Sequence, residues 1–187
     1  MVSVKYRPNI LLLSLSGLES FDDVYKPLIS RLLDISYLTR VRTASAALKE
    51  IDSTKFKAVI VTDEGLAEPE NQVAMVRLKT YIESGGLVVV GLQLSTFVRQ
   101  DRFKAFFKAF DLTWVSGSYQ VSPICFVPSS TFPRSLKPSS LPGPRTVNAR
   151  HVQNSKPHER MFVSIPNPKR HNDAETGRVA GSGAALA

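Results

Sequence analysis

Seven polar side chains stand at or just after the ends of three apolar runs, and they are the best candidates for chemistry in this sequence. They are Ser14, Ser16, Asp63, Glu64, Gln93, Ser95 and Thr96. The runs cover residues 10–15, 58–62 and 87–91, and each is short and apolar enough for a buried strand. In open α/β sheets, ligands bind in the crevice outside the carboxyl ends of the strands. We therefore predict a ligand site built by the loops that follow these three runs.

Asp63 and Glu64 are the acidic members of this set, and two interpretations of them are open. Adjacent side chains on an extended segment point apart, so the two carboxyl groups do not form an acid and base pair by spacing alone. The favoured interpretation makes one of them a turn or helix cap and leaves the other solvated. The alternative keeps both at the ligand site, because they follow the end of a strand.

Candidate nucleophiles are few. Cys125 is the single cysteine and lies in the apolar run ICFV, where a thiol is expected to be an inert structural residue. One cysteine forms no internal disulfide, which fits a reducing, cytoplasmic location. Ser16 precedes Gly17, but the Gly-x-Ser-x-Gly elbow of α/β-hydrolases is absent from the sequence.

Metal and cofactor signals are weak as well. The three histidines, His151, His158 and His171, are 7 and 13 residues apart, and no HExxH motif accompanies them. No Gly-x-Gly-x-x-Gly motif and no Walker loop follow the first apolar run. The sequence therefore predicts neither a metal site nor a cofactor.

Strand-like and helix-like segments alternate along the first 110 residues. Strands are predicted at residues 10–15, 35–41, 58–62 and 87–91, and helices at residues 24–33, 44–50, 69–82 and 100–110, the last preceded by a loop at residues 92–99. In the third helix we expect Val73, Val76 and Leu78 to face the core. This alternation favours an α/β fold with a mostly parallel sheet and helices on both faces, of the flavodoxin-like, three-layer kind. A hairpin-like or edge pair is predicted at residues 114–118 and 122–127, where Pro123 argues against a central strand.

Composition changes after residue 127. Residues 1–127 hold 15 Lys/Arg and 13 Asp/Glu, whereas residues 128–187 hold 9 and 3. We predict an α/β domain at residues 1–127, followed at 128–187 by a Pro/Ser-rich basic tail that is poorly structured and partly ordered at most, with one strand at residues 161–165. The basic residues are dispersed among prolines, so a solvated linker is favoured over a nucleic-acid binder. No apolar run reaches the roughly 20 residues of a membrane helix, and residues 10–15 fit a buried strand better than a signal peptide.

Short motifs in the central region carry a resemblance to a known family. TDEG at residues 62–65, the double glycine at 85–86 and VVVG at 88–91 resemble the class I glutamine amidotransferase-like, flavodoxin-like superfamily. Within it, the order of elements over residues 8–127 is similar to the ThuA-like branch and related uncharacterised fungal proteins. The resemblance implies a Gly-x-Cys-x-Gly elbow with a nucleophilic cysteine, where this chain has Gly91-Leu92-Gln93-Leu94-Ser95. Gln93 then takes the nucleophile position, so amidotransferase or cysteine-hydrolase activity is not expected.

Three functional hypotheses follow. The first is a non-catalytic or vestigial amidotransferase-like domain that binds a small molecule or a protein partner at the strand ends. The second is a ThuA-like hydrolase or isomerase acting on a small, sugar-like metabolite through Asp63 and Glu64. The third is nucleic-acid binding by the basic tail, which is the least favoured. The final residues GSGAALA resemble the start of a strand that relatives continue, so a truncated sheet with an open edge, and a homodimer through that edge, is a further expectation.

Overall fold

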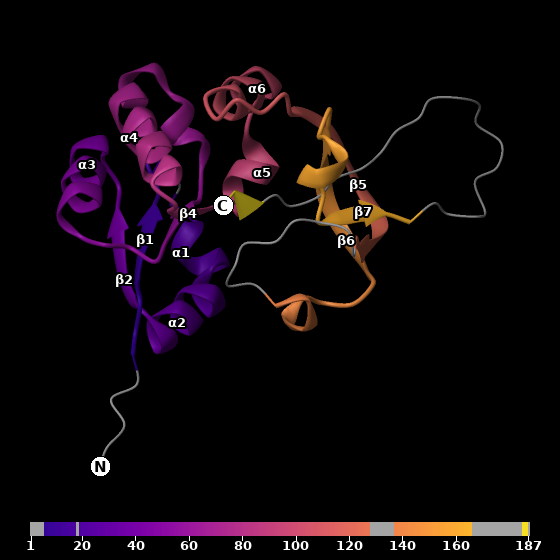
Figure 1. The fold of residues 1–187 in the computed structure, drawn as a ribbon, viewed down its shortest axis with the longest axis horizontal. Helices are drawn as coiled ribbons and strands as arrows, with labels where there is room; N and C mark the ends of the chain where they lie inside the picture. The colour runs from indigo at the N-terminus through magenta and orange to yellow at the C-terminus, as the bar shows by residue number, and fades with distance from the viewer. Residues whose placement is uncertain (1–5, 18, 128–136, 166–184, 187) are drawn as a thin grey trace, which may run out of the picture. The chain divides into compact units, whose positions relative to one another are not determined.

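The structure is a computed structural model that describes residues 6–17, 19–127, 137–165 and 185–186. The chain divides into two compact units (Figure 1). The first comprises Met1–Val98 with Ala185–Ala187, and the second comprises Arg99–Ala184.

The first unit contains a parallel sheet. Its strands are β1 (Asn9–Leu13), β2 (Tyr37–Val41), β3 (Ala58–Val61) and β4 (Leu87–Val90), in the order β2-β1-β3-β4. A two-residue strand, β8 (Ala185–Leu186), pairs antiparallel with β4. In register, Leu11 lies beside Val59, and Val59 lies beside Val88. The predicted parallel sheet is confirmed, because β1 pairs in parallel with both β2 and β3, and β3 pairs in parallel with β4.

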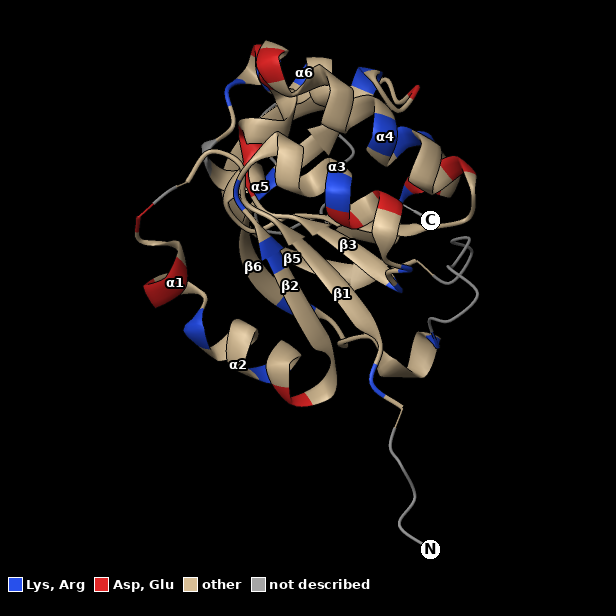
Figure 2. Ribbon diagram, turned by 90° about the vertical axis from the view of Figure 1, so that its left-hand side faces the viewer, with Lys and Arg blue, Asp and Glu red and all other residues tan. Residues whose placement is uncertain are grey.

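Helices connect these strands. They are α1 (Phe21–Val24), α2 (Lys26–Ile35), α3 (Ala44–Ser53), α4 (Gln72–Glu83) and α5 (Gln93–Phe97), and two 3-10 turns, η1 (Glu64–Ala67) and η2 (Pro69–Asn71), precede α4. Helix α3 begins where the sequence predicts, because the Thr43 side chain accepts a hydrogen bond from the backbone N–H of Ala46. Figure 2 shows α1 and α2 on one side of the sheet and α3 and α4 on the other. The unit is therefore an α/β structure.

One face of the parallel sheet is packed much more closely than the other. Val59, Val61 and Val88 are at most 1% exposed, and Leu78 of α4 is fully buried. Val73 and Val76 of the same helix are 65% and 63% exposed, so their predicted core positions are wrong. A helix turns 100° per residue, and the packing that buries Leu78 turns these two valines toward solvent. Helix α2, although amphipathic, contains no fully buried residue.

The second unit is a helix followed by an antiparallel sheet. Its elements are α6 (Gln100–Lys108), β5 (Val115–Phe126), η3 (Pro138–Ser140), β6 (Arg145–Gln153), η4 (Pro157–Glu159) and β7 (Phe162–Ser164). The strand order is β6-β5-β7. The pairing of β5 with β6 and β7 joins residues before and after the domain boundary predicted at residue 127. The predicted apolar face of α6 is confirmed at Phe103, Phe106 and Phe107, which are buried, and the predicted strand at residues 161–165 is confirmed as β7.

The predicted hairpin within residues 114–127 is wrong. Those residues form one 12-residue strand, β5, which is the central strand of the sheet. A register irregularity between Ser116 and Tyr119 accommodates Gly117, where an added Cβ would lie 2.9 Å from the carbonyl oxygen of His151. Pro123 lies within this central strand, and its carbonyl oxygen accepts a hydrogen bond from the backbone N–H of Ile165 at 2.9 Å, a bond that needs no proline N–H.

Among the residues that the structure describes, no helix combines the length and apolar character that crossing a membrane requires.

Candidate ligand site at the strand ends of the parallel sheet

Asp63 organises the loops at the carboxyl ends of β1 and β3. Its Oδ1 accepts backbone hydrogen bonds from Leu15 and Ser16, both at 3.1 Å, and from Gly65 at 3.0 Å. The side chain is 3% exposed. Two of these donors belong to the loop after β1 and the third belongs to η1, so one carboxylate oxygen fixes both loops. The capping interpretation of Asp63 therefore agrees with the geometry.

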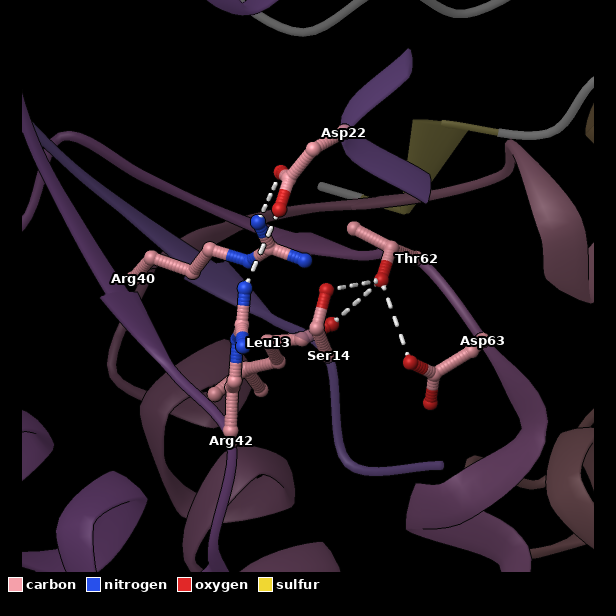
Figure 3. Close-up of polar contacts among 7 residues, drawn as sticks. All are labelled: Leu13, Ser14, Asp22, Arg40, Arg42, Thr62 and Asp63. Carbon is pink, nitrogen blue, oxygen red and sulfur yellow. Dashed lines mark hydrogen bonds and ion pairs between the residues drawn. The ribbon is translucent and has the colours of Figure 1, made fainter. Parts of the chain in front are cut away.

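A buried hydroxyl pair lies beside this carboxylate (Figure 3). The hydroxyl oxygens of Ser14 and Thr62 are 2.7 Å apart, and the Thr62 hydroxyl also lies 2.8 Å from the carbonyl oxygen of Leu13 and 3.3 Å from Asp63 Oδ2. Both hydroxyl-bearing residues are buried. Ser14 is one of the predicted site residues, whereas the sequence pattern predicts only the end of a strand at Thr62. The polar side chain of Thr62 at the end of an apolar run is the sequence feature that indicates a place at the site.

Gly65 allows the two loops to approach each other. A Cβ atom on Gly65 would lie 2.5 Å from the backbone nitrogen of Ser16 and 2.6 Å from the carbonyl carbon of Leu15. Backbone atoms cannot give way as a flexible side chain can. The glycine of the TDEG motif is therefore needed for this close contact between the β1 and β3 loops.

The turn from β4 into α5 has an unusual backbone conformation. Leu92 has φ 58° and ψ −120°, a region that residues with a side chain rarely adopt. Gln93, which the resemblance assigns to the nucleophile position, is the first residue of α5, so the loop predicted at residues 92–99 contains a short helix. The strained position of this strand-to-helix turn thus belongs to a leucine. The sequence did not indicate this, because a leucine has no preference for positive φ.

Two buried acceptors at this edge of the sheet have no hydrogen-bond partner among the described residues. They are Gln93 Oε1 and Glu64 Oε2. Gln93 is 4% exposed, and the backbone N–H of the next residue, Leu94, donates to the carbonyl oxygen of Thr62 at 2.9 Å. That bond ties the start of α5 to the end of β3, and α5 also packs against η1, which contains Glu64. Both unpartnered acceptors therefore belong to neighbouring elements that follow β3 and β4.

The remaining predicted site residues, unlike Ser14, Asp63 and Gln93, are not fully buried. Ser16 is exposed and contributes its backbone N–H to Asp63. Ser95 is exposed as well, and its hydroxyl donates to the carbonyl oxygen of Leu92 at 2.9 Å. Thr96 is half-buried in α5. The structure thus brings Ser14, Ser16 and Asp63 together through hydrogen bonds and places Gln93 and Glu64 on adjoining elements.

A cluster of charged side chains lies near the end of β2, and Figure 3 draws it together with Ser14, Thr62 and Asp63. Asp22 of α1 binds the guanidinium groups of Arg40 and of Arg42, the latter at 3.1 Å. The Arg40 guanidinium also lies 4.5 Å from the centroid of the Phe21 ring. These contacts hold α1 against β2 and engage both arginines, so they serve the fold.

The described part of the second unit contains a buried polar pair that the sequence pattern does not indicate. His151 is 4% exposed, and its Nε2 lies 2.8 Å from the hydroxyl oxygen of Ser122 on the neighbouring strand. Burial lowers the pKa of His151, because desolvation disfavours the charged imidazolium. No group of three metal-ligating side chains occurs within the described residues. Cys125 lies in β5 opposite Val163, which places its thiol within a strand as expected.

In comparisons with known proteins, no family model, no curated protein and no solved structure matches this chain.

Proposed function

We propose that the first unit is a non-catalytic, flavodoxin-like, three-layer domain that binds a small molecule rich in hydrogen-bond donors. The ligand lies at the carboxyl ends of β3 and β4 and donates to Gln93 Oε1 and Glu64 Oε2. The single observation that carries this proposal is that both oxygens are buried without a partner among the described residues.

The energetic reason is the cost of burying polar atoms. A buried acceptor left without a hydrogen bond costs about 1–3 kcal/mol. Native proteins keep few such groups, and each calls for an explanation such as a bound water, an ion or a ligand. A ligand whose hydroxyl, amide or ammonium groups reach both oxygens recovers this cost on binding. Because the two protein atoms are acceptors only, the matching ligand supplies donors, as a polyol or an amine does.

The strand order and the turn after β4 support this assignment. The order β2-β1-β3-β4 corresponds to the flavodoxin-like order of doubly wound sheets, in which ligands bind outside the carboxyl ends of the strands. At the sharp turn after β4, neither Leu92 nor Gln93 has a side chain that can act as a nucleophile. Asp63 Oδ1 is already occupied by three backbone donors. Binding without turnover is the function that fits these residues.

The test is a thermal melt of the full chain against a panel of polyols, sugars and small amines. Binding to the folded state raises its stability by mass action, about 2.7 kcal/mol at a ligand concentration one hundred times the dissociation constant. Gln93→Met removes the amide oxygen at similar volume, and Glu64→Gln removes the charge while keeping an oxygen. We expect Gln93→Met to abolish the stabilisation by a hit.

Ser95→Ala is the matched control, since Ser95 lies on the same helix and is exposed. It should leave the ligand-induced shift unchanged. The proposal fails if no member of the panel stabilises the protein, or if a hit stabilises Gln93→Met as much as the unmodified chain.

A further inference from the structure

The net charge of the protein is confined to the second unit. Residues 1–98 with 185–187 hold 11 Lys/Arg and 11 Asp/Glu, whereas residues 99–184 hold 13 and 5. The first unit is thus neutral, and the second carries the entire formal charge of +8. Such an excess on one unit attracts polyanions over distances of about a Debye length.

One face of the β6-β5-β7 sheet carries exposed side chains, among them the aromatic ring of Tyr119. Side chains alternate between faces along β5, so Tyr119, Val121 and Pro123 share one face, and Ser122 and Ile124 share the other. The second face is buried at both of these residues. On the first face, Tyr119 is 50% exposed and Val121 is 67% exposed. An exposed tyrosine beside an exposed valine on a sheet offers a flat apolar surface.

Strand β6 adds polar and basic groups to the same face. By register, Arg150 lies directly opposite Tyr119, and Asn148 lies opposite Val121. The Arg150 guanidinium is held in place by a hydrogen bond to the Ser116 hydroxyl, at 2.7 Å. An arginine fixed beside an exposed aromatic ring can contact a phosphate while a base stacks on that ring. An asparagine side chain next to them can hydrogen-bond to a base edge.

We propose that this open sheet face, defined by Tyr119, Val121, Asn148 and Arg150, binds single-stranded nucleic acid. One base stacks on Tyr119, and Arg150 holds an adjacent phosphate. Other basic residues of the same unit that are exposed, Lys137, Arg145 and Lys156, raise the local concentration of the polyanion. A single strand is favoured over a duplex, because stacking on a protein ring requires bases that are not already paired and stacked.

This inference is independent of the ligand site in the first unit. It also differs from the expectation that the basic residues form a solvated linker. That expectation rests on a poorly structured tail at residues 128–187 whose basic residues are dispersed among prolines. In the structure, β6 pairs with β5, and this pairing sets Arg150 beside Tyr119, 31 residues earlier in the sequence.

The experiment measures fluorescence anisotropy of a labelled 16-nucleotide oligo-dT and of oligo-U of equal length, titrated with the full chain at 50 mM salt. We expect saturable binding of the single strands, and weaker binding of a duplex of the same length. Tyr119→Ala should weaken single-strand binding about tenfold, whereas Tyr119→Phe should retain it because phenylalanine keeps the stacking face. With about three phosphates neutralised, log Kd should rise with log salt concentration with a slope of about 2.

Tyr6→Ala is the matched control, since Tyr6 is 81% exposed and belongs to the first unit. Circular dichroism of each variant shows that it is folded. The proposal is overturned if the chain does not bind the oligonucleotides, or if it binds duplex as tightly as single strands. It is also overturned if Tyr119→Ala and Tyr6→Ala bind equally well. Binding to anionic vesicles of phosphatidylserine and phosphatidylcholine, without binding to oligonucleotides, would identify the charge of this unit as a membrane-surface feature instead.

Discussion

Removing the Asp63 carboxylate is the most direct test of how the strand ends are held together. In Asp63→Ala, the backbone N–H groups of Leu15, Ser16 and Gly65 lose their common acceptor in a site where Asp63 itself is 3% exposed. A hydrogen bond to a charged group contributes about 1.5–3 kcal/mol. The three bonds share one oxygen and are not additive, so we expect a loss of about 3–5 kcal/mol in the free energy of unfolding of the first unit.

Asp63→Asn is the matched comparison. The amide oxygen can occupy the position of Oδ1, and the amide nitrogen can donate to the hydroxyl of Thr62, which lies 3.3 Å from Oδ2 in the present structure. The three bonds then persist as bonds to a neutral acceptor, which are roughly half as strong as charge-assisted ones. We expect a loss of about 1–2 kcal/mol.

The assay must report on the first unit specifically. Trp114 is the only tryptophan and lies in the second unit, so its fluorescence follows the other part of the chain. Hydrogen exchange of the Leu15 and Ser16 amides reads the broken bonds directly, and urea unfolding followed by far-ultraviolet circular dichroism gives the overall loss. The reasoning is refuted if Asp63→Ala costs less than about 1 kcal/mol and both amides keep their protection.

Three further predictions concern the backbone and the buried histidine. Gly65→Ala should destabilise the first unit by about 2–4 kcal/mol in urea unfolding, because the added Cβ would clash with the loop after β1. Gly91→Ala is the control: its Cβ would meet nothing within 4 Å, so its free energy of unfolding should change by less than about 1 kcal/mol. Equal losses in the two variants would contradict this reasoning. Leu92→Gly should be more stable than Leu92→Ala by about 1 kcal/mol, because glycine adopts a positive φ without the steric cost that a Cβ atom adds. Both variants lose the packing of the leucine side chain, so their difference reports the backbone strain. If Leu92→Ala is the more stable of the two, the turn is unstrained. Because the pKa of His151 is lowered on folding, the unfolded state binds more protons, so the stability of the second unit should be full above pH 6.5 and fall as the pH drops below it. Trp114 fluorescence during urea unfolding at pH 7.5 and pH 5.5 checks this, and His151→Gln should lessen the difference.

Local sequence signals predicted several elements correctly. The β-branched runs before Thr62 and Gly91 became β3 and β4, and Thr43 capped α3, because these features depend on a few neighbouring residues. The same holds for the phenylalanine face of α6, whose spacing follows the helical period. Register and burial were less predictable. The exposure of Val73 depends on how α4 packs on the sheet, which no local pattern specifies.

The candidate site was predictable in part. Its general position followed from the rule that loops after parallel strands meet at one edge of the sheet, and Ser14, Asp63 and Gln93 all lie there. Which atoms contact each other was not predictable. The three backbone donors on Asp63 come from two loops separated by 47 or more residues, and the role of Thr62 depends on the alignment of β1 with β3.

By itself, then, the sequence determined the alternation of strands and helices, the parallel class of the first sheet and the polar character of the strand ends. Each of these follows from hydrophobic period, chain length and the conformations open to glycine and proline. Only the tertiary structure decided that Leu92 holds the strained turn, that Gln93 Oε1 is buried without a partner among the described residues, and that Arg150 stands beside Tyr119. The physical reason is that these features depend on contacts between distant segments. Their geometry is set by the packing of the whole unit rather than by the preferences of neighbouring residues.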